Sequence, residues 1–355
     1  MLEHPETAGD TAADEAEVVV EGIGVDAVAA PPANRGQIHG TQDRVRSACR
    51  VRTSRSKWEV GPGVWYVVAS ALAFSVMTSF VKIAGHRLPS QEVVAARGAV
   101  SLLLSWILVR RAGLSPWGTH RRLLLLRGFL GYLALSCVFH AVATMPLADA
   151  TVLQYLYPLF TAILATAILG ERPNARVVIA GAASLAGILL VARPSFLFGS
   201  DAAALNLVDV TIAVCGALLT AFAYVGVKHL TALEHPLVIV FYFPLVTFPA
   251  TLPALLHSAL MPTPAEALAL VGVGIATQAG QVFLTQGLQH LSATRATALT
   301  YLQVVFATTW GAVFFGEIPD HRSMVGAMLV VSGAFLLGIT RVRDQPRASG
   351  PFRAA

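Results

Sequence analysis

The residues Ala148 to Pro173 read ADATVLQYLYPLFTAILATAILGERP, an apolar stretch that ends in Gly, Glu, any residue and Pro. A second stretch, Thr294 to Pro319, begins 146 positions later and reads TRATALTYLQVVFATTWGAVFFGEIP, with the same ending. The two stretches align without a gap, so that Glu171 falls on Glu317, and the same offset continues on both sides. One register held over so long a distance indicates a duplicated unit.

The composition is typical of an integral membrane protein. Of the 355 residues, 55% are hydrophobic and only 13% are charged, too few for an ordinary soluble domain. Apolar runs approach the roughly 20 residues that cross a bilayer, and in lipid such spans must be helices, because their backbone polar groups need internal partners. We predict an all-α membrane protein with ten transmembrane helices. The predicted spans are Val64–Ala84, Glu92–Val109, Leu123–Thr144, Ala150–Leu169, Val177–Ala192, Val210–Gly226, Leu237–Leu256, Ala267–Leu288, Ala296–Phe315 and Met324–Ile339.

The charges predict the orientation of the chain. With the N-terminus inside, 20 of the 25 Lys and Arg residues fall on the inner side and four on the outer side, so both termini are predicted to be cytoplasmic. Residues 1–57 form a predicted disordered tail, acidic and then basic, and residues 341–355 form a basic tail. No signal peptide is predicted. The basic part of the first tail is interpreted as a topology determinant rather than a nucleic-acid site.

The duplicated unit contains five spans in each copy. Residues 64–192 form the first predicted repeat and residues 210–340 the second. Because five is odd, the second copy enters the membrane from the opposite side, and the repeats are inverted. Inverted repeats are typical of carriers in which two related halves rock about a site near the midplane.

Polar residues at helical spacing predict a binding face. Three of them lie on one side of the fourth span, and the ninth span has polar residues at the same three positions. These stripes either line a pathway or hydrogen-bond across a dry helix interface. The stripe residues are Thr151, Gln154 and Tyr157 and, in the second repeat, Thr297, Thr300 and Gln303. Tyr155 and Tyr301 lie beside the two stripes, and Gln281 lies on the eighth span. All of these residues are candidates for substrate binding.

Arg97 is the one fixed charge that the sequence places near the middle of a span. An intramembrane cation is costly and is a functional-site hypothesis by default. Its alternatives are a bond to backbone carbonyls of another helix or an ion pair with Glu92. The acidic residues near the membrane all lie at predicted span ends, which disfavours an organic cation as cargo. A zwitterionic or anionic metabolite that contacts Arg97 is therefore predicted.

Three further residues could take part in transport or only support the fold. His140, in the third span, could relay a proton or simply form a hydrogen bond. Glu171 and Glu317 each follow the C-terminal end of a helix, where a negative charge opposes the helix dipole. We expect compensation by nearby arginines such as Arg172, and a structural or gate role rather than substrate contact. The three cysteines imply no disulfide or metal site, and no cofactor is expected.

The sequence PLADATVLQYLYPLFTAILATAILGERP resembles the end of the EamA domain of the drug/metabolite transporter superfamily, and TALTYLQVVFATTWGAVFFGEIP resembles its second copy. The glycine-rich spans that follow and an Arg in the second span agree with this resemblance. It covers about residues 64 to 340 and implies a ten-helix carrier of two inverted repeats with a central cavity. The R-G-x-x-G segment at Arg127 to Gly131 looks like the branch with S-adenosylmethionine and riboflavin importers.

The function expected from these features is secondary transport. We expect a non-enzymatic carrier that moves a small metabolite across the cytoplasmic membrane by alternating access. Its expected partners are this metabolite and the lipid bilayer, with no nucleic acid, and the chain is expected to act as a monomer or homodimer. The alternative is a membrane-embedded structural, regulatory or lipid-handling protein without solute transport.

Overall fold

The computed structural model describes residues 61–85, 87–172, 174–198, 206–258, 260–316 and 319–339. The two predicted tails, residues 1–57 and 341–355, and the candidate residue Glu317 lie outside these ranges. Throughout the described residues all regular secondary structure is helical, which confirms the predicted all-α class.

Ten segments of the described chain are long and apolar enough to cross a membrane, as predicted. Eight of them are single helices, while the fourth and ninth are each built from two shorter helices. The predicted span ends agree with the observed ends to within about one helical turn. The helices are α2 (Pro62–Ala84), α3 (Ser90–Arg111), α4 (Arg121–Thr144), α5 (Leu147–Gln154), α6 (Tyr157–Leu169), α7 (Ala175–Ala192), the short α8 (Ser195–Phe198), α9 (Leu207–Leu230), α10 (Pro236–Ser258), α11 (Pro264–His290), α12 (Ala293–Leu299), α13 (Leu302–Phe315) and α14 (His321–Ile339).

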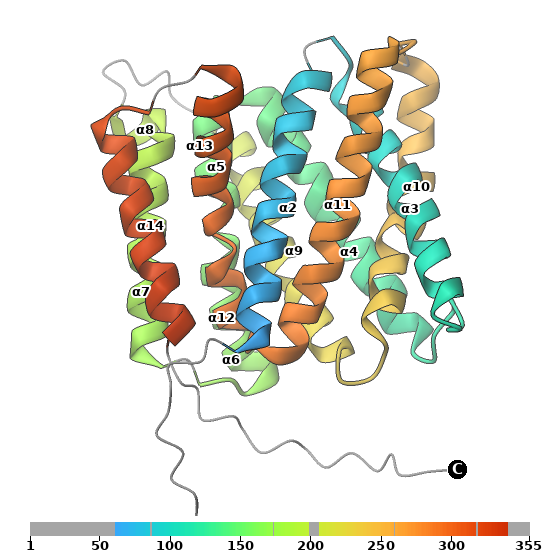
Figure 1. Cartoon of the computed structure of the whole chain (residues 1–355), viewed down its shortest axis with the longest axis horizontal. Coiled ribbons are helices and arrows are strands. Elements are labelled where there is room, and N and C mark those ends of the chain that lie inside the picture. Colours follow the sequence, from blue (N-terminus) through green and yellow to red (C-terminus); the bar gives the residue numbers. More distant parts are fainter. Residues whose placement is uncertain are drawn as a thin grey trace, which may run out of the picture. The chain divides into compact units, whose positions relative to one another are not determined.

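The two repeats interlock instead of folding side by side. Helix α2 packs on α11 and α4 packs on α9, and these two contacts are equivalent under the 146-residue offset. Helices α3 and α10 pack on each other, as do α7 and α14, and each of these pairs joins equivalent spans of the two repeats. Figure 1 shows α2 between α13 and α11, with the start of α2 and the end of α14 at the same lower end. The core is therefore shared by both repeats.

Glycine allows the closest of these contacts. A Cβ atom on Gly187 of α7 would lie 2.5 Å from the carbonyl oxygen of Gly326 on α14. A Cβ atom on its repeat equivalent, Gly333, would lie 2.7 Å from the carbonyl oxygen of Ala180. Both distances are far inside van der Waals contact, so the α7–α14 pair depends on small residues, as many membrane helix pairs do.

The fourth and ninth spans are interrupted at equivalent positions. Helix α5 ends at Gln154 and α6 begins at Tyr157, where Pro158 lacks the N–H that would continue the helix. Helix α12 ends at Leu299 and α13 begins at Leu302, with no proline at the break. There the chain uses tighter bonds between residues three apart, such as the Val304 N–H to the Tyr301 carbonyl at 3.1 Å. By contrast, α10 continues as one helix through its three prolines, Pro244, Pro249 and Pro253.

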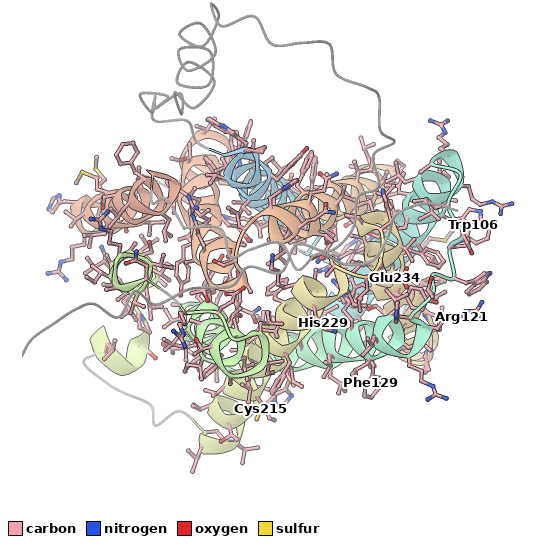
Figure 2. All side chains as sticks on the ribbon, turned by 90° about the horizontal axis from the view of Figure 1, so that it is seen from below. Trp106, Arg121, Phe129, Cys215, His229 and Glu234 are labelled. Atoms are coloured by element: carbon pink, nitrogen blue, oxygen red, sulfur yellow. The ribbon has the colours of Figure 1, made fainter. Side chains whose placement is uncertain are left out.

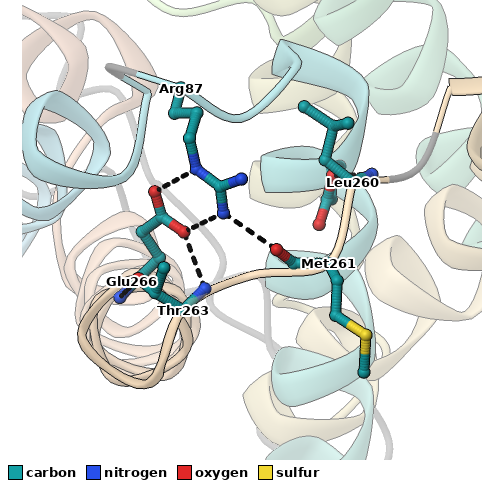
Figure 3. A network of polar contacts seen from close by, with 6 residues as sticks. Arg87, Leu260, Met261, Thr263 and Glu266 are labelled. Atoms are coloured by element: carbon teal, nitrogen blue, oxygen red, sulfur yellow. Dashed lines mark hydrogen bonds and ion pairs between the residues drawn. The ribbon is translucent and has the colours of Figure 1, made fainter.

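The loop between α2 and α3, at the upper end of Figure 1, is joined to the second repeat by an ionic contact. Arg87, between α2 and α3, donates from Nε and Nη2 to the two carboxylate oxygens of Glu266, at 2.9 and 2.6 Å. The same Nη2 donates to the carbonyl of Met261 at 2.8 Å, and Thr263 N–H donates to Glu266 (Figure 3). The loop of the first repeat is thereby held to the start of α11.

The outer surface of the bundle is rich in large apolar side chains. Phe129 on α4 is about half exposed, as are Leu103 on α3 and Ile163 on α6. In Figure 2 Phe129 and Cys215 lie at the periphery of the bundle. Such a surface suits lipid rather than water.

Candidate functional site

Arg97 lies on α3 and faces α10. It is half-buried, and within the described chain it forms no hydrogen bond or ion pair. Glu92, which the sequence offered as its ionic partner, instead accepts a hydrogen bond from the Leu260 N–H at 3.1 Å. Arg97 lines a small cavity with room for about one water molecule. The other lining residues are Val94, Gly98, Ser101, Phe243, Pro244 and Thr247.

Arg127 is a second intramembrane cation that the sequence interpretation missed. It was counted with the inner charges, but α4 begins at Arg121, so Arg127 lies well inside the helix and only 4% of it is exposed. Its Nη2 donates to the Oε1 of Gln281 at 3.2 Å, whereas Nε and Nη1 are buried and have no partner. The view of Arg97 as the one mid-span charge was therefore wrong.

The ring of Phe243 on α10 connects the two arginines. The guanidinium carbon of Arg127 lies 4.8 Å from the ring centroid, and that of Arg97 lies 5.7 Å from it. Both contacts are cation–π interactions. Phe243 is also the repeat equivalent of Arg97, so equivalent positions of the two repeats meet at this site.

The R-G-x-x-G segment of α4 has a direct structural explanation. A Cβ atom on Gly128 would lie 2.7 Å from the carbonyl oxygen of Tyr242, and one on Gly131 would lie 2.8 Å from the ring of Phe243. The two glycines thus let α4 approach α10 and leave room for the ring beside Arg127. This motif was the sequence signal that could have found the second arginine.

Helix α11 adds polar groups next to Arg127. Thr277 and Gln278 lie about one turn from Gln281, on or near the same face of the helix. Gln278 is 4% exposed, and both its Nε2 atom and the Thr277 hydroxyl are buried without a hydrogen-bond partner. The hydroxyl of Thr247, one turn after Phe243 on α10, is buried and unpartnered in the same way. Donors without acceptors therefore accumulate where α3, α4, α10 and α11 meet.

The predicted polar stripes meet at the helix breaks. The Tyr157 hydroxyl on α6 shares a hydrogen bond with the hydroxyl of Thr300, across the boundary between the repeats. The Tyr301 hydroxyl donates to the carbonyl of Tyr155 at 3.0 Å, and the two rings lie 5.9 Å apart. All four residues are buried. These hydrogen bonds across a buried helix interface match the alternative in which the stripes hold helices together and do not line a pathway.

The remaining stripe residues differ in their surroundings. Thr297 is fully buried, and its hydroxyl donates to the Ala293 carbonyl of its own helix at 2.9 Å. Thr151, Gln154 and Gln303 are half-buried and have no hydrogen bond from their side chains to any described residue. These three keep the free polar groups that a pathway would use.

Tyr224 on α9 lies beside the stripes. Its ring lies 5.3 Å from that of Tyr157. The same side chain packs against the buried cluster that contains Tyr155, Tyr157 and Tyr301 and against the main core cluster, to which Tyr242 of α10 belongs. The polar stripes and the core around α10 therefore meet at Tyr224.

His140 lies away from this interior. Its Nε2 contacts the carboxylate of Asp209 at 2.8 Å, and its side chain is largely exposed at the end of α4. This geometry satisfies the hydrogen-bond alternative for His140, and the proton relay stays a prediction. In the part of the chain that the structure describes, no three His, Cys, Asp or Glu side chains cluster as metal ligands.

Glu171 caps the start of α12. Its carboxylate accepts hydrogen bonds from the N–H groups of Ala293 and Thr294, at 2.8 and 3.3 Å, and from the Thr294 hydroxyl at 3.2 Å. Gly170, with φ of 67°, ends α6 in the left-handed conformation just before it. The partner of Glu171 is thus a positive helix N-terminus of the other repeat, and the expected arginine Arg172 is exposed beside it.

Ten membrane-length segments of the described chain, in two interlocked copies with two arginines that lack a carboxylate partner between them, define a two-repeat polytopic membrane protein. The chain belongs to the EamA-like transporter family, whose model matches residues 61–193 and again residues 209–339. The two matches correspond to the two copies recognised from the offset, and the predicted membership is confirmed.

Several relatives of this chain have transport names. The pseudopaline exporter CntI of Pseudomonas aeruginosa is 34% identical over 280 residues, which cover 79% of this chain and 96% of the exporter. Human solute carrier family 35 member G1 is 30% identical over 315 residues, covering 82% and 86% of the two chains. A solved crystal structure matches the fold with a TM-score of 0.68 at 18% identity, covering 77% of this chain and 95% of the other. Family and relatives support membrane transport of a small molecule.

Proposed function

We propose that this protein is a secondary carrier of a small anionic or zwitterionic metabolite. The observation that carries the proposal is the pair of intramembrane arginines, Arg97 and Arg127, neither of which has a described carboxylate partner. A buried charge normally requires a partner or a neutral form, and arginine stays charged in proteins. A cargo with an acidic group would supply the missing partner during transport.

The surrounding groups favour the same kind of cargo. The Nε2 atom of Gln278 and the free nitrogens of Arg127 are donors, and the unpartnered threonine hydroxyls can also donate. Carboxylates accept several hydrogen bonds and form their strongest ones with charged donors. The part of the cargo away from its acidic group could contact the half-buried side chains of Thr151, Gln154 and Gln303. Tyr155, Tyr157 and Tyr301 would be its aromatic neighbours.

Alternating access is the mechanism that the interlocked repeats support best. The cation site lies among α3, α4, α10 and α11, which are the second and third spans of each repeat. Contacts between the repeats hold each end of the bundle: Glu171 to α12 at one end, and Arg87 to Glu266 at the other. In this mechanism the contacts at one end of the bundle break while those at the other end remain, so the site opens to one side of the membrane at a time.

Other observations favour a direction of transport and a membrane in which the protein acts. One relative is named as an exporter, which favours outward movement over the import that the R-G-x-x-G resemblance implied. The distribution of Lys and Arg favours the cytoplasmic membrane with both termini inside. No described feature favours the structural, regulatory or lipid-handling alternative.

The test is transport by the purified protein in proteoliposomes. Labelled metabolites of negative, zwitterionic and positive charge are offered with and without proton and sodium gradients. We expect uptake of an anionic or zwitterionic solute, loss of that uptake in Arg97→Gln, and normal uptake in the exposed control Arg121→Gln. Folded protein that moves no solute would refute the proposal. Loss of function on deletion of residues 1–57 alone would favour the regulatory alternative.

A further inference from the structure

We infer that the cargo carries two anionic groups, which Arg97 and Arg127 bind together around the ring of Phe243. This inference rests on the proposed carrier function and specifies its substrate class. The candidate residues of the sequence analysis did not include Arg127, so the second cation comes from the structure.

Two guanidinium groups in the interior of a membrane protein repel each other and lack the water that would screen them. A cargo with one carboxylate neutralises one of them and leaves the other uncompensated. A cargo with two acidic groups matches both, so the pair of arginines predicts a preference for dianions over monoanions.

Both guanidinium carbons lie within 6 Å of one ring centroid, at 4.8 and 5.7 Å, so their separation cannot exceed these two distances added together. A small diacid with a few carbons between its acidic groups can span a separation of this size. The two arginines are therefore close enough to act on one molecule.

Gln281 occupies only the Nη2 atom of Arg127, and the buried Nε and Nη1 atoms remain without an acceptor. The amide Nε2 of Gln278 is also buried and unpartnered. Leaving several buried donors unsatisfied costs free energy, and the oxygens of a second carboxylate would satisfy them.

The position of Phe243 explains why only one arginine faces the cavity. Phe243 lines the cavity together with Arg97, while Arg127 is buried behind the ring. In this structure the ring of Phe243 therefore covers Arg127. Binding of the second acidic group displaces the ring, which in this structure fills the space that a side chain at position 131 would need.

The experiment compares matched diacids and their monoamides with the purified full chain. Succinate is compared with succinamate, glutarate with glutaramate, and L-glutamate with L-glutamine, at millimolar concentration. Binding is followed by thermal stabilisation and titration calorimetry. We expect at least one diacid to bind about tenfold or more tightly than its monoamide, the effect of one additional charge-assisted contact.

Variants assign the effect to the two arginines. Arg127→Gln should bring diacid and monoamide to similar affinity, whereas Arg127→Lys should keep part of the preference. Arg97→Gln, at the cavity wall, should reduce the preference independently if Arg127→Gln fails to fold. Arg121→Gln, exposed on the first turn of α4 (Figure 2), is the matched control and should behave as wild type.

Three results would overturn the inference. They are equal binding of diacids and monoamides to the wild type, a preference that survives both glutamine variants, and absence of binding across the whole series. The carrier proposal is judged separately by proteoliposome transport. Transport of monoanions or zwitterions without any preference for diacids would leave the carrier standing and reject only the dianionic cargo.

Discussion

Replacement of Glu171 should destabilise the contact between α6 and α12. Glu171 is 9% exposed, and its carboxylate accepts three hydrogen bonds from Ala293 and Thr294, which are themselves buried. In Glu171→Ala the first N–H groups of α12 lose their acceptor, and the helix N-terminus loses a negative charge. In Glu171→Gln an amide oxygen remains, so part of the capping persists.

The magnitude follows from these contacts. A hydrogen bond to a charged group contributes about 1.5–3 kcal/mol. A charge at a helix terminus contributes up to about 2 kcal/mol in partly buried geometry. Because these effects overlap, we expect a loss of about 3 kcal/mol for Glu171→Ala and about 1–2 kcal/mol for Glu171→Gln. In a chain of this size, 3 kcal/mol corresponds to roughly 5 °C in melting temperature.

The assay is thermal unfolding of the purified protein in detergent, compared at one scan rate because unfolding of such proteins is often irreversible. Thr294→Val removes only the hydroxyl contact and should give a smaller shift. Arg172→Gln, exposed beside Glu171, is the matched control and should give almost none. A melting temperature of Glu171→Ala within about 1 °C of wild type would refute the capping role.

Three further outcomes are expected. Tyr301→Phe removes the donor to the Tyr155 carbonyl and should cost about 1 kcal/mol in thermal unfolding, and an unchanged melting temperature would contradict this. Gly326→Ala places a Cβ atom 2.5 Å from the Gly187 carbonyl oxygen and should cost about 1–3 kcal/mol, whereas normal stability would show that the helices adjust freely. The guanidinium of Arg193 holds the pKa of Asp320 below its ordinary value. This pair should therefore stabilise the protein above about pH 4 and lose its effect in more acidic solution, so the difference in melting temperature between wild type and Asp320→Asn should shrink on acidification.

The number and course of the spans could be predicted because they depend on local composition. Apolar run length predicted ten spans, and the offset between Ala148–Pro173 and Thr294–Pro319 predicted two copies. Both signals are independent of which helices touch. The observed ends differ mainly by the extra turn that helices such as α9 extend beyond the apolar run.

The second cation could not be predicted from its own helix. Arg127 lies six residues after the start of α4, where a lone arginine normally reaches the membrane surface. Its burial depends on the close approach of α10, which brings Phe243 over it from 116 positions away. The glycines of R-G-x-x-G mark that approach, yet their partner cannot be read from one sequence.

The break in the ninth span was likewise beyond local analysis. Pro158 predicts an interruption in the fourth span, but the equivalent residue Val304 carries no such signal. The two breaks lie at equivalent positions of the repeats and contact each other, for example through the hydrogen bond from the Tyr301 hydroxyl to the Tyr155 carbonyl. The partner of Glu171 escaped prediction for the same reason, because Ala293 and Thr294 belong to the other repeat.

The exchange of helices between repeats matters during synthesis. Helix α2 leaves the ribosome about 180 residues before its partner α11 begins, which at 5–20 residues per second is roughly 10–40 s. Throughout this interval the nascent first repeat lies in the bilayer without the helices that will cover it, and lipid or the insertion machinery must occupy those faces. A gene fragment for either repeat alone should therefore yield an unstable product, whereas two fragments expressed together can complete each other.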